Sequence, residues 1–305
     1  MNLLNRLTVG LMPIVPKPII RKISSRYIAG ETIADAVRVI RGLENEGCCA
    51  TVDILGEYIT LKEEALAAVE GYLEALEMIH AEGVDSNVSV KLTALGLGLD
   101  EEFCFENIKK IVEKAGDLGN FVRIDMEDSQ YTTKTIELYR RLRKSHDNVG
   151  VVLQAYLRRT RSDVANIING FDQVNFRLCK GIYVERREIA YKEPELINMN
   201  YANLLEEMLK KGVYVGIATH DEKLVWRAFE IIDRLQIPKE NYEFQMLLGV
   251  DEELRRIIVS EKRKLRVYVP FGEHWYGYSS RRLKENPQIA GYIIKNFFDS
   301  PRKDA

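Results

Sequence analysis

Short runs of apolar and β-branched residues recur at regular intervals along this chain of 305 residues. Between them lie segments whose apolar residues repeat with the period of an amphipathic helix. The pattern predicts eight strands, at residues 49–55, 87–93, 121–125, 151–156, 173–180, 213–218, 243–248 and 265–270. It predicts helices at residues 62–81, 101–117, 132–144, 161–169, 201–211, 222–235 and 251–262. Apolar strands that alternate with helices are typical of a parallel sheet covered by helices.

Eight strand–helix units in a chain of this length favour an α/β fold, a modified (βα)8 barrel of the TIM type. A doubly wound open sheet is the alternative. No strand leads into a complete G-x-G-x-x-G turn, since Gly96 and Gly98 are not followed by the third glycine. We expect residues 1–46 to form an N-terminal helical arm packed on the barrel, with a helix at 32–42, and residues 47–305 to form the catalytic barrel, as a single structural domain overall.

Composition and charge narrow the class of protein. The net charge is −2 and the basic runs are short and mixed with acidic residues, so nothing favours nucleic acid as a partner. The four cysteines form no C-x-x-C pair, which favours a reducing compartment such as the cytoplasm. Charged residues and prolines interrupt the apolar stretch at 3–20, so we expect an amphipathic arm there; contact with a membrane surface is a weaker alternative.

Polar residues gather where the predicted strands end. In a (βα)8 barrel the carboxyl ends of the strands converge on one face, where active sites form. By strand, these residues are Asp53 and Glu57; Lys91; Asp125, Glu127 and Asp128; Gln154; Arg177 and Lys180; Thr219, His220 and Asp221; Gln245; and Tyr268. Each alone has a structural explanation, and their joint placement is what indicates an active site.

Two kinds of chemistry are open for this face from the residues alone. Asp125, Glu127 and Asp128 offer the oxygen ligands that hard cations bind, but strand alternation sends Asp128 away from the other two, and we expect no metal. A Schiff-base enzyme of the aldolase type, acting on a carboxylated substrate, is the main alternative. A buried lysine with a lowered pKa, at Lys91 or Lys180, is a workable nucleophile.

A third pattern lies near the end of the chain. Tyr278, Arg281, Arg282 and Glu285 stand at offsets of 0, 3, 4 and 7, which places them on one face if the segment is helical. Two guanidinium groups on one face are suited to bind a small carboxylate. An ordinary surface ion pair between Arg281 and Glu285 explains the same spacing.

Nine segments in order along the chain resemble the proline dehydrogenases, specifically the monofunctional bacterial form. They are VDILGE at 52–57, VSVKL at 88–92, VRIDMED at 122–128, LQAY at 153–156, RLCKGIY at 177–183, ATH at 218–220, FQML at 244–247, RVYVP at 266–270 and YSSRRLKE at 278–285. The chain departs from the family pattern at Ile182, where alanine is usual, and at Asp221, where asparagine is common. The resemblance implies a modified (βα)8 barrel whose mouth is capped by the C-terminal helix.

The resemblance also implies a set of substrate residues and a set of cofactor residues. Arg281 and Arg282 would bind the carboxylate of proline, with Lys91 and Glu285 in the surrounding ion pairs. The residues that line the substrate pocket would be Asp125, Leu247, Tyr268 and Tyr278. The residues that bind FAD would be Gln154, Arg177, Lys180, Gly181, Thr219, His220 and Gln245, with Arg177 near the flavin N5.

The reaction implied by the resemblance is the oxidation of L-proline to Δ1-pyrroline-5-carboxylate by hydride transfer from C5 to flavin N5, the first step of proline catabolism to glutamate. A quinone would accept the electrons, with peripheral contact at the inner face of the cell membrane. A separate pyrroline-5-carboxylate (glutamate semialdehyde) dehydrogenase would take the product. No residue stands out as a dedicated base, so Asp125, Tyr268 and water are all open. A noncatalytic flavin-binding barrel is the remaining alternative.

Overall fold

Parallel pairing between successive strands organises residues 26–275, the part of the chain that the computed structural model describes. Each strand pairs with the next in the sequence, and β8 pairs with β1, so the sheet closes into a barrel. The strands are β1 (Cys49–Ile54), β2 (Ser86–Val90), β3 (Val122–Ile124), β4 (Val149–Gln154), β5 (Asn175–Cys179), β6 (Tyr214–Ala218), β7 (Tyr242–Leu247) and β8 (Leu265–Phe271). The predicted α/β barrel is confirmed.

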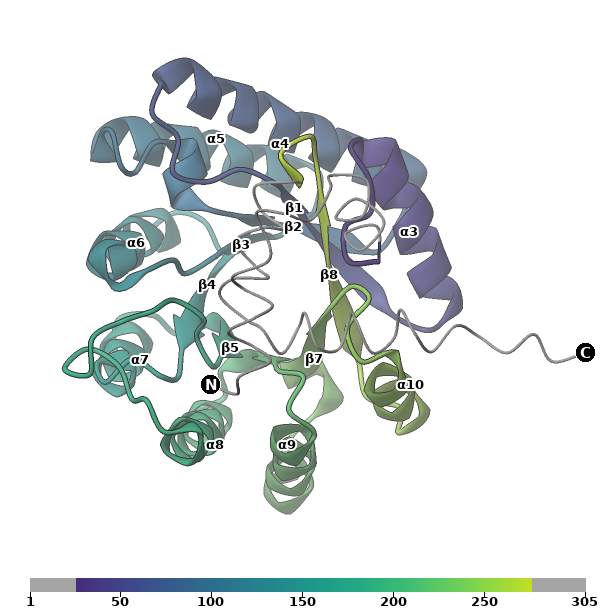
Figure 1. The fold of residues 1–305 in the computed structure, drawn as a ribbon, viewed down its shortest axis with the longest axis vertical. Helices are drawn as coiled ribbons and strands as arrows, with labels where there is room; N and C mark the ends of the chain where they lie inside the picture. The colour runs from purple at the N-terminus through teal and green to yellow at the C-terminus, as the bar shows by residue number, and fades with distance from the viewer. Residues whose placement is uncertain (1–25, 276–305) are drawn as a thin grey trace, which may run out of the picture.

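Helices follow the strands and lie around the outside of the barrel (Figure 1). They are α4 (Lys62–Glu82), α5 (Glu101–Asp117), α6 (Ser129–Arg143), α7 (Thr160–Ile168), α8 (Pro194–Lys210), α9 (Glu222–Leu235) and α10 (Glu252–Ser260). Short 3-10 helices, η2 (Leu92–Leu95) and η3 (Lys239–Asn241), lie in the connections. One more helix, α3 (Ile33–Asn45), precedes β1 and packs against β1, β8 and α4.

Aspartates begin several of the helices at the carboxyl face of the barrel. Asp100, Asp128, Asp221 and Asp251 each accept a hydrogen bond from a backbone N–H in the first turn of α5, α6, α9 and α10. Such a cap gives a partner to an N–H that has none inside the helix, and negative charge is favourable at that end of the helix dipole. The caps fix where the strand-to-helix loops end, and these loops border the barrel mouth.

Two of the predicted boundaries that differ from the structure have a clear local reason. The strand predicted at 87–93 ends at Val90, because the chain turns into η2, which ends at Gly96 in the left-handed conformation. The helix predicted at 201–211 begins at Pro194, a residue suited to the first helical position. Leu196 and Met199 in its first turns are exposed, so the apolar period of a buried helix face is not visible there.

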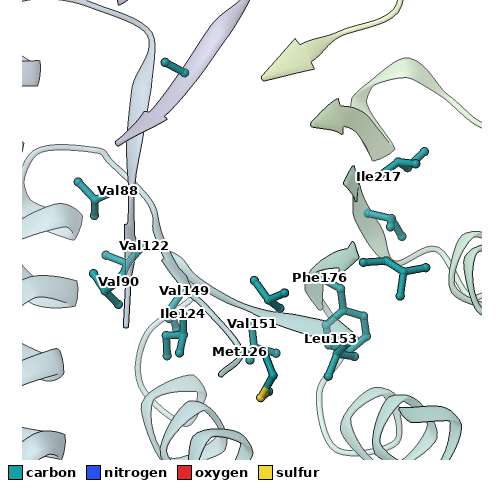
Figure 2. Close-up of a cluster of buried hydrophobic side chains, with 14 of the residues drawn as sticks. Val88, Val90, Val122, Ile124, Met126, Val149, Val151, Leu153, Phe176 and Ile217 are labelled. Carbon is teal, nitrogen blue, oxygen red and sulfur yellow. The ribbon is translucent and has the colours of Figure 1, made fainter. Parts of the chain in front are cut away.

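The apolar core lies between the strands and the helices. Alternate strand residues such as Val88, Val122 and Val151 join one buried cluster with the helices (Figure 2). Successive side chains of a strand point to opposite faces, so the residues between them point into the barrel. Many of those inward residues are buried and polar, among them Ser89 and Arg123. The barrel interior therefore holds many of the buried polar groups in the described part of the chain.

Some expectations fall on residues outside 26–275. The capping helix at 278–285 and the first 25 residues of the predicted arm are not among the described residues. The division of the chain at residue 46 stays a prediction. Within the described range, no helix is both long enough and apolar enough to cross a membrane.

Candidate active site

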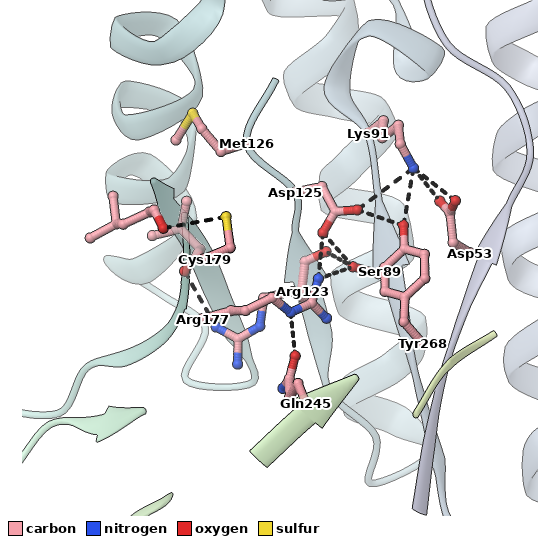
Figure 3. Close-up of polar contacts among 12 residues, drawn as sticks. Asp53, Ser89, Lys91, Arg123, Asp125, Met126, Arg177, Cys179, Gln245 and Tyr268 are labelled. Atoms are coloured by element: carbon pink, nitrogen blue, oxygen red, sulfur yellow. Dashed lines mark hydrogen bonds and ion pairs between the residues drawn. The ribbon is translucent and has the colours of Figure 1, made fainter. Parts of the chain in front are cut away.

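Polar side chains from strands that are not neighbours in the sheet meet inside the barrel (Figure 3). Contacts between β3 and β5, between β5 and β7, and between β3 and β8 must cross the interior, because only consecutive strands and β1 with β8 pair directly. The buried members of this network are Asp53, Ser89, Lys91, Asp125, Arg177, Gln245 and Tyr268. The structure thus brings together six residues that the sequence places at the barrel mouth: Asp53, Lys91, Asp125, Arg177, Gln245 and Tyr268.

Lys91, directly after β2, forms a buried ion pair with Asp53 of β1. Its Nζ lies 2.8 Å and 2.7 Å from the two carboxylate oxygens of Asp53 and donates to the Tyr268 hydroxyl at 3.1 Å. Burial opposes the charge, but the carboxylates of Asp53 and Asp125 raise the pKa of Lys91 well above its ordinary value. Lys91 is therefore a fixed cation. A Schiff-base mechanism needs a neutral lysine, so this geometry counts against Lys91 as an aldolase-type nucleophile.

Asp125 is the centre of the network. Its Oδ1 accepts hydrogen bonds from Ser89 Oγ at 2.6 Å and Arg177 Nη1 at 2.7 Å, and its Oδ2 accepts one from the Tyr268 hydroxyl at 2.8 Å. Lys91 Nζ lies 3.6 Å from Oδ2. Burial opposes ionisation, but Arg177, Lys91 and the hydrogen bonds outweigh it and lower the pKa of Asp125. Asp125 is therefore a stable anion and a weak base.

Arg177 and Gln245 continue the network across the barrel. Arg177 Nε donates to Gln245 Oε1, and Gln245 Nε2 donates to Glu243 Oε1 at 2.7 Å. The remaining terminal nitrogen of Arg177, Nη2, makes no hydrogen bond within residues 26–275. At the end of β4, the buried Gln154 donates to Met126 O at 3.4 Å, while its Oε1 has no partner among the described residues. The site therefore keeps donors and acceptors available to a ligand.

A second group of the expected residues lies where β5, β6 and β7 end. Lys180 Nζ donates to Asp221 at 2.6 Å. The Thr219 hydroxyl accepts the backbone N–H of Asp221 at 3.1 Å. His220 Nε2 accepts the backbone N–H of Leu247 at 2.8 Å and so joins the loop after β6 to the end of β7. The aspartate at position 221 is thus the counter-ion of Lys180, a role that a neutral asparagine would not fill.

Gly181 makes the turn that carries the chain away from β5. Its φ is +107°, a backbone conformation that residues with a Cβ rarely adopt. A Cβ at this position would lie 2.1 Å from the ring of Tyr156. Only glycine fits this close approach. Two polar atoms in this region, the Tyr156 hydroxyl and Asn198 Oδ1, are buried and have no hydrogen-bond partner in the described part of the chain.

The carboxylates considered for a metal have separate partners. Glu127 accepts the backbone N–H of Thr93 at 3.0 Å and also the Thr93 hydroxyl. Asp128 accepts the Tyr58 hydroxyl at 3.2 Å and caps α6, while Asp125 belongs to the network above. Burial raises the pKa of Glu127 to about 7. Across residues 26–275, no three or more His, Cys, Asp or Glu side chains are grouped as a metal site requires.

The sequence does not assign every member of the network. Asp53 is placed at the barrel mouth but without a partner, and the structure pairs it with Lys91. Ser89 is not among the expected residues, although it lies two positions before Lys91 and so points to the same side of β2. The signal that could have identified Ser89 is its place in the strand, two positions before the charged Lys91. Four expected residues, Tyr278, Arg281, Arg282 and Glu285, lie outside the described residues.

Comparison with known proteins assigns the chain to a family. A family model described as proline dehydrogenase matches residues 36–293. The chain belongs to the proline dehydrogenase family. Proline dehydrogenase 1 of Bacillus subtilis (strain 168) is 34% identical over 270 residues, which cover 88% of this chain and 89% of the relative. The proline dehydrogenase of Deinococcus radiodurans is 34% identical over 278 residues, which cover 90% of this chain and 89% of the relative.

The barrel also resembles part of a larger solved structure. Proline utilization A (PutA) from Bdellovibrio bacteriovorus, inactivated by N-propargylglycine, matches with a TM-score of 0.84 at 24% identity. The match covers 97% of this chain and 38% of that longer protein, so the likeness shows the fold. The predicted resemblance to proline dehydrogenases is confirmed. The chain is an enzyme of a flavin-dependent family, and it oxidises proline to Δ1-pyrroline-5-carboxylate.

Proposed function

We propose that the chain binds FAD at the carboxyl face of the barrel and oxidises L-proline there, with hydride leaving C5 of the ring for N5 of the flavin. The observation that carries the proposal is the buried network of Lys91, Asp125, Arg177 and Tyr268 in a chain of the proline dehydrogenase family. A fixed anion between two cations and a phenol is suited to orient a small amino acid, because its dipoles are in place before the substrate binds.

The residues present fit a flavin dinucleotide. Buried polar atoms usually have partners, so those without one indicate where a polar ligand completes the site. Of the eleven such atoms in the described range, three belong to residues at the end of β4 or beside the loops after β5 and β6: Gln154 Oε1, the Tyr156 hydroxyl and Asn198 Oδ1. Arg177 and Lys180 add cationic donors for anionic groups of the ligand. With Gly181, Thr219, His220 and Gln245 they would hold FAD, which when bound supplies the hydride acceptor.

Most of the residues proposed to hold the substrate come from the C-terminal part of the chain. Arg281 and Arg282 would bind the carboxylate of proline, because a guanidinium binds a carboxylate through paired hydrogen bonds. Glu285 would be their ion-pair partner. Leu247, Tyr268 and Tyr278 would line the space around the ring and exclude water from it. These assignments rest on the sequence motif and on family membership.

Asp125 would orient the proline amine without acting as its base. The nitrogen must be neutral when hydride leaves C5, since its lone pair stabilises the positive charge that develops. Arg177 and Lys91 lower the pKa of Asp125, so its carboxylate accepts hydrogen bonds but holds a proton weakly. Water would therefore take the ammonium proton, and Asp125 would accept the remaining N–H.

The partners proposed for the reaction come from the family. Electrons would pass to a quinone, with the enzyme in peripheral contact with the inner face of the cell membrane. Δ1-Pyrroline-5-carboxylate would pass to a separate pyrroline-5-carboxylate dehydrogenase. Incubating the protein anaerobically with L-proline and a short-chain quinone tests the acceptor. Proline-dependent quinol formation supports it, and reduced flavin that does not react with the quinone contradicts it.

The flavin site is tested by replacing Arg177 with methionine. The apoprotein of Arg177→Met should bind FAD more weakly in a fluorescence titration, because a buried cationic donor is lost. The matched control is Arg161→Met, which removes an exposed arginine that pairs with Glu207 on the outside of the barrel. Equal FAD affinity in the wild type and Arg177→Met would remove Arg177 from the proposed site.

A further inference from the structure

Glu243 lies in the barrel interior. It neighbours the candidate active site but is not one of the residues assigned to that site. It precedes Gln245 by two positions in β7, so both side chains point into the interior. Its Oε1 accepts hydrogen bonds from Arg266 Nε at 2.8 Å and from Gln245 Nε2 at 2.7 Å. Lys264 Nζ lies 3.2 Å from its other oxygen. A continuous series of buried side-chain hydrogen bonds thus runs from Asp125 through Arg177, Gln245 and Glu243 to Arg266.

The charge of Glu243 is secured by its neighbours. Burial opposes ionisation, but Arg266 and Lys264 outweigh it and lower the pKa of Glu243 to about 2. The ionised carboxylate has no hydrogen to donate, so it is an acceptor in every hydrogen bond that it makes. At any pH near neutrality, Glu243 therefore presents only acceptor atoms to Gln245.

This fixes which way the amide of Gln245 points. A glutamine amide has a donor end, Nε2, and an acceptor end, Oε1. Gln245 stands between Glu243, which only accepts, and the guanidinium of Arg177, which only donates. Only one of the two amide orientations satisfies both neighbours. The reverse orientation would place N–H groups against Arg177 and an oxygen against the carboxylate.

The space around the amide is fitted to the same arrangement. Gly216 on β6 lies beside Gln245, and a Cβ at position 216 would lie 2.5 Å from Gln245 Nε2. Because the amide is held at both ends by hydrogen bonds, it cannot move aside as the end of a mobile side chain would. The neighbouring strand therefore leaves room for the amide in its observed place.

We infer that Glu243 is a positioning residue for the reaction: through the amide of Gln245 it holds Arg177 against Asp125 and toward the flavin. The inference rests on the proposed flavin site of Arg177. A purely structural role is the competing explanation, since Arg266 also donates to the backbone oxygen of Ala50 and so ties Glu243 to β1. The two roles differ in one respect, which is whether the effect of Glu243 depends on Gln245.

A double-mutant cycle separates the two roles. Glu243→Gln should lower kcat for proline about tenfold to a hundredfold, as expected for the loss of a hydrogen bond to a charged group, and weaken FAD binding by the apoprotein. KM for proline should change about threefold or less, because the carboxylate clamp is elsewhere. In a Gln245→Met background, which has no amide to orient, adding Glu243→Gln should change kcat and FAD affinity about twofold or less. Glu207→Gln, the same change on the surface of α8, is the matched control.

Each outcome bears on the inference. If Glu243→Gln lowers kcat and FAD affinity equally in both backgrounds, Glu243 acts as a structural residue and the inference is wrong. Should Glu243→Gln not fold, Glu243→Asp takes its place in the cycle, since it keeps the charge for Arg266 but withdraws the carboxylate from Gln245. Wild-type protein whose flavin is not reduced by proline would instead overturn the proposed function, which the cycle does not test.

Discussion

Tyr268 on β8 donates a 2.8 Å hydrogen bond to Asp125, which follows β3 across the interior of the barrel. The same hydroxyl accepts a hydrogen bond from Lys91 Nζ at 3.1 Å. The phenol therefore joins a fixed cation and a fixed anion that themselves lie 3.6 Å apart. It holds the two charged groups in one geometry without neutralising either, which is what a site that orients a substrate requires.

Replacing Tyr268 with phenylalanine should lower kcat for proline about tenfold, the effect of one hydrogen bond to a charged group. KM should change less, because the proposed carboxylate clamp remains. Steady-state kinetics with an artificial electron acceptor measures both constants. Tyr242→Phe is the control, since its buried hydroxyl accepts a 2.7 Å hydrogen bond from Arg263 away from the network. An equal loss in both variants would show that the effect of Tyr268 is not specific to the site.

Replacing Asp53 with alanine should destabilise the fold by about 3–5 kcal/mol, because it leaves Lys91 as a buried charge without its closest partner. Urea unfolding at neutral pH measures the change. The double variant Asp53→Ala, Lys91→Met should be more stable than Asp53→Ala alone, since no buried charge is left uncompensated. A double variant less stable than either single one would mean that the ion pair is not the reason for the loss.

Replacing Arg281 or Arg282 with methionine should raise KM for proline by the equivalent of about 2–4 kcal/mol, the cost of removing one partner of a charge-paired contact. Flavin content should not change, because FAD is assigned to other residues. Arg256→Met, an exposed change on α10, is the control. A KM close to that of the wild type would end the assignment of these arginines to the substrate carboxylate.

The raised pKa of Glu127 should be visible in how the free energy of unfolding changes with pH. Burial raises the pKa of Glu127 in the folded chain from an ordinary 4.5 to about 7. Its contribution to stability is therefore present below pH 4.5 and is lost as the pH rises through about 7. Relative to the wild type, Glu127→Gln should gain about 3 kcal/mol in the free energy of unfolding between about pH 4.5 and 8.

Urea unfolding at several pH values tests this, with Glu102→Gln as the control, an exposed carboxylate that pairs with Arg141. A pH-independent difference between Glu127→Gln and the wild type would show that folding does not raise the pKa of Glu127.

The sequence predicts the barrel and the site residues that lie at the ends of its strands. Short runs of apolar and β-branched residues identify strands such as the one that contains Val88 and Val90, because their outward faces must pack on helices. The polar residues that end the strands identify the mouth. The residue two positions before a strand end also points into the barrel, but the strand-end pattern does not identify it as part of the network. Ser89, before Lys91, and Glu243, before Gln245, are the two examples.

The sequence also leaves open which charged side chains from different strands pair with each other. The sequence places Lys91 among the ion pairs of the substrate clamp but does not name Asp53 as its partner. Within residues 26–275, Lys91 has Asp53 at 2.7 Å and Asp125 at 3.6 Å. Which carboxylate is nearer depends on how β1, β2 and β3 are staggered around the closed barrel. That stagger follows from the packing of the whole sheet and cannot be read from any one strand.

The most direct test of the account is the visible spectrum of the purified protein, recorded anaerobically before and after addition of L-proline. The account predicts a bound flavin whose absorption bleaches with L-proline and not with buffer alone. Protein that is colourless and cannot be reconstituted with FAD would contradict the proposed cofactor, and bound flavin that proline does not bleach would contradict the proposed reaction.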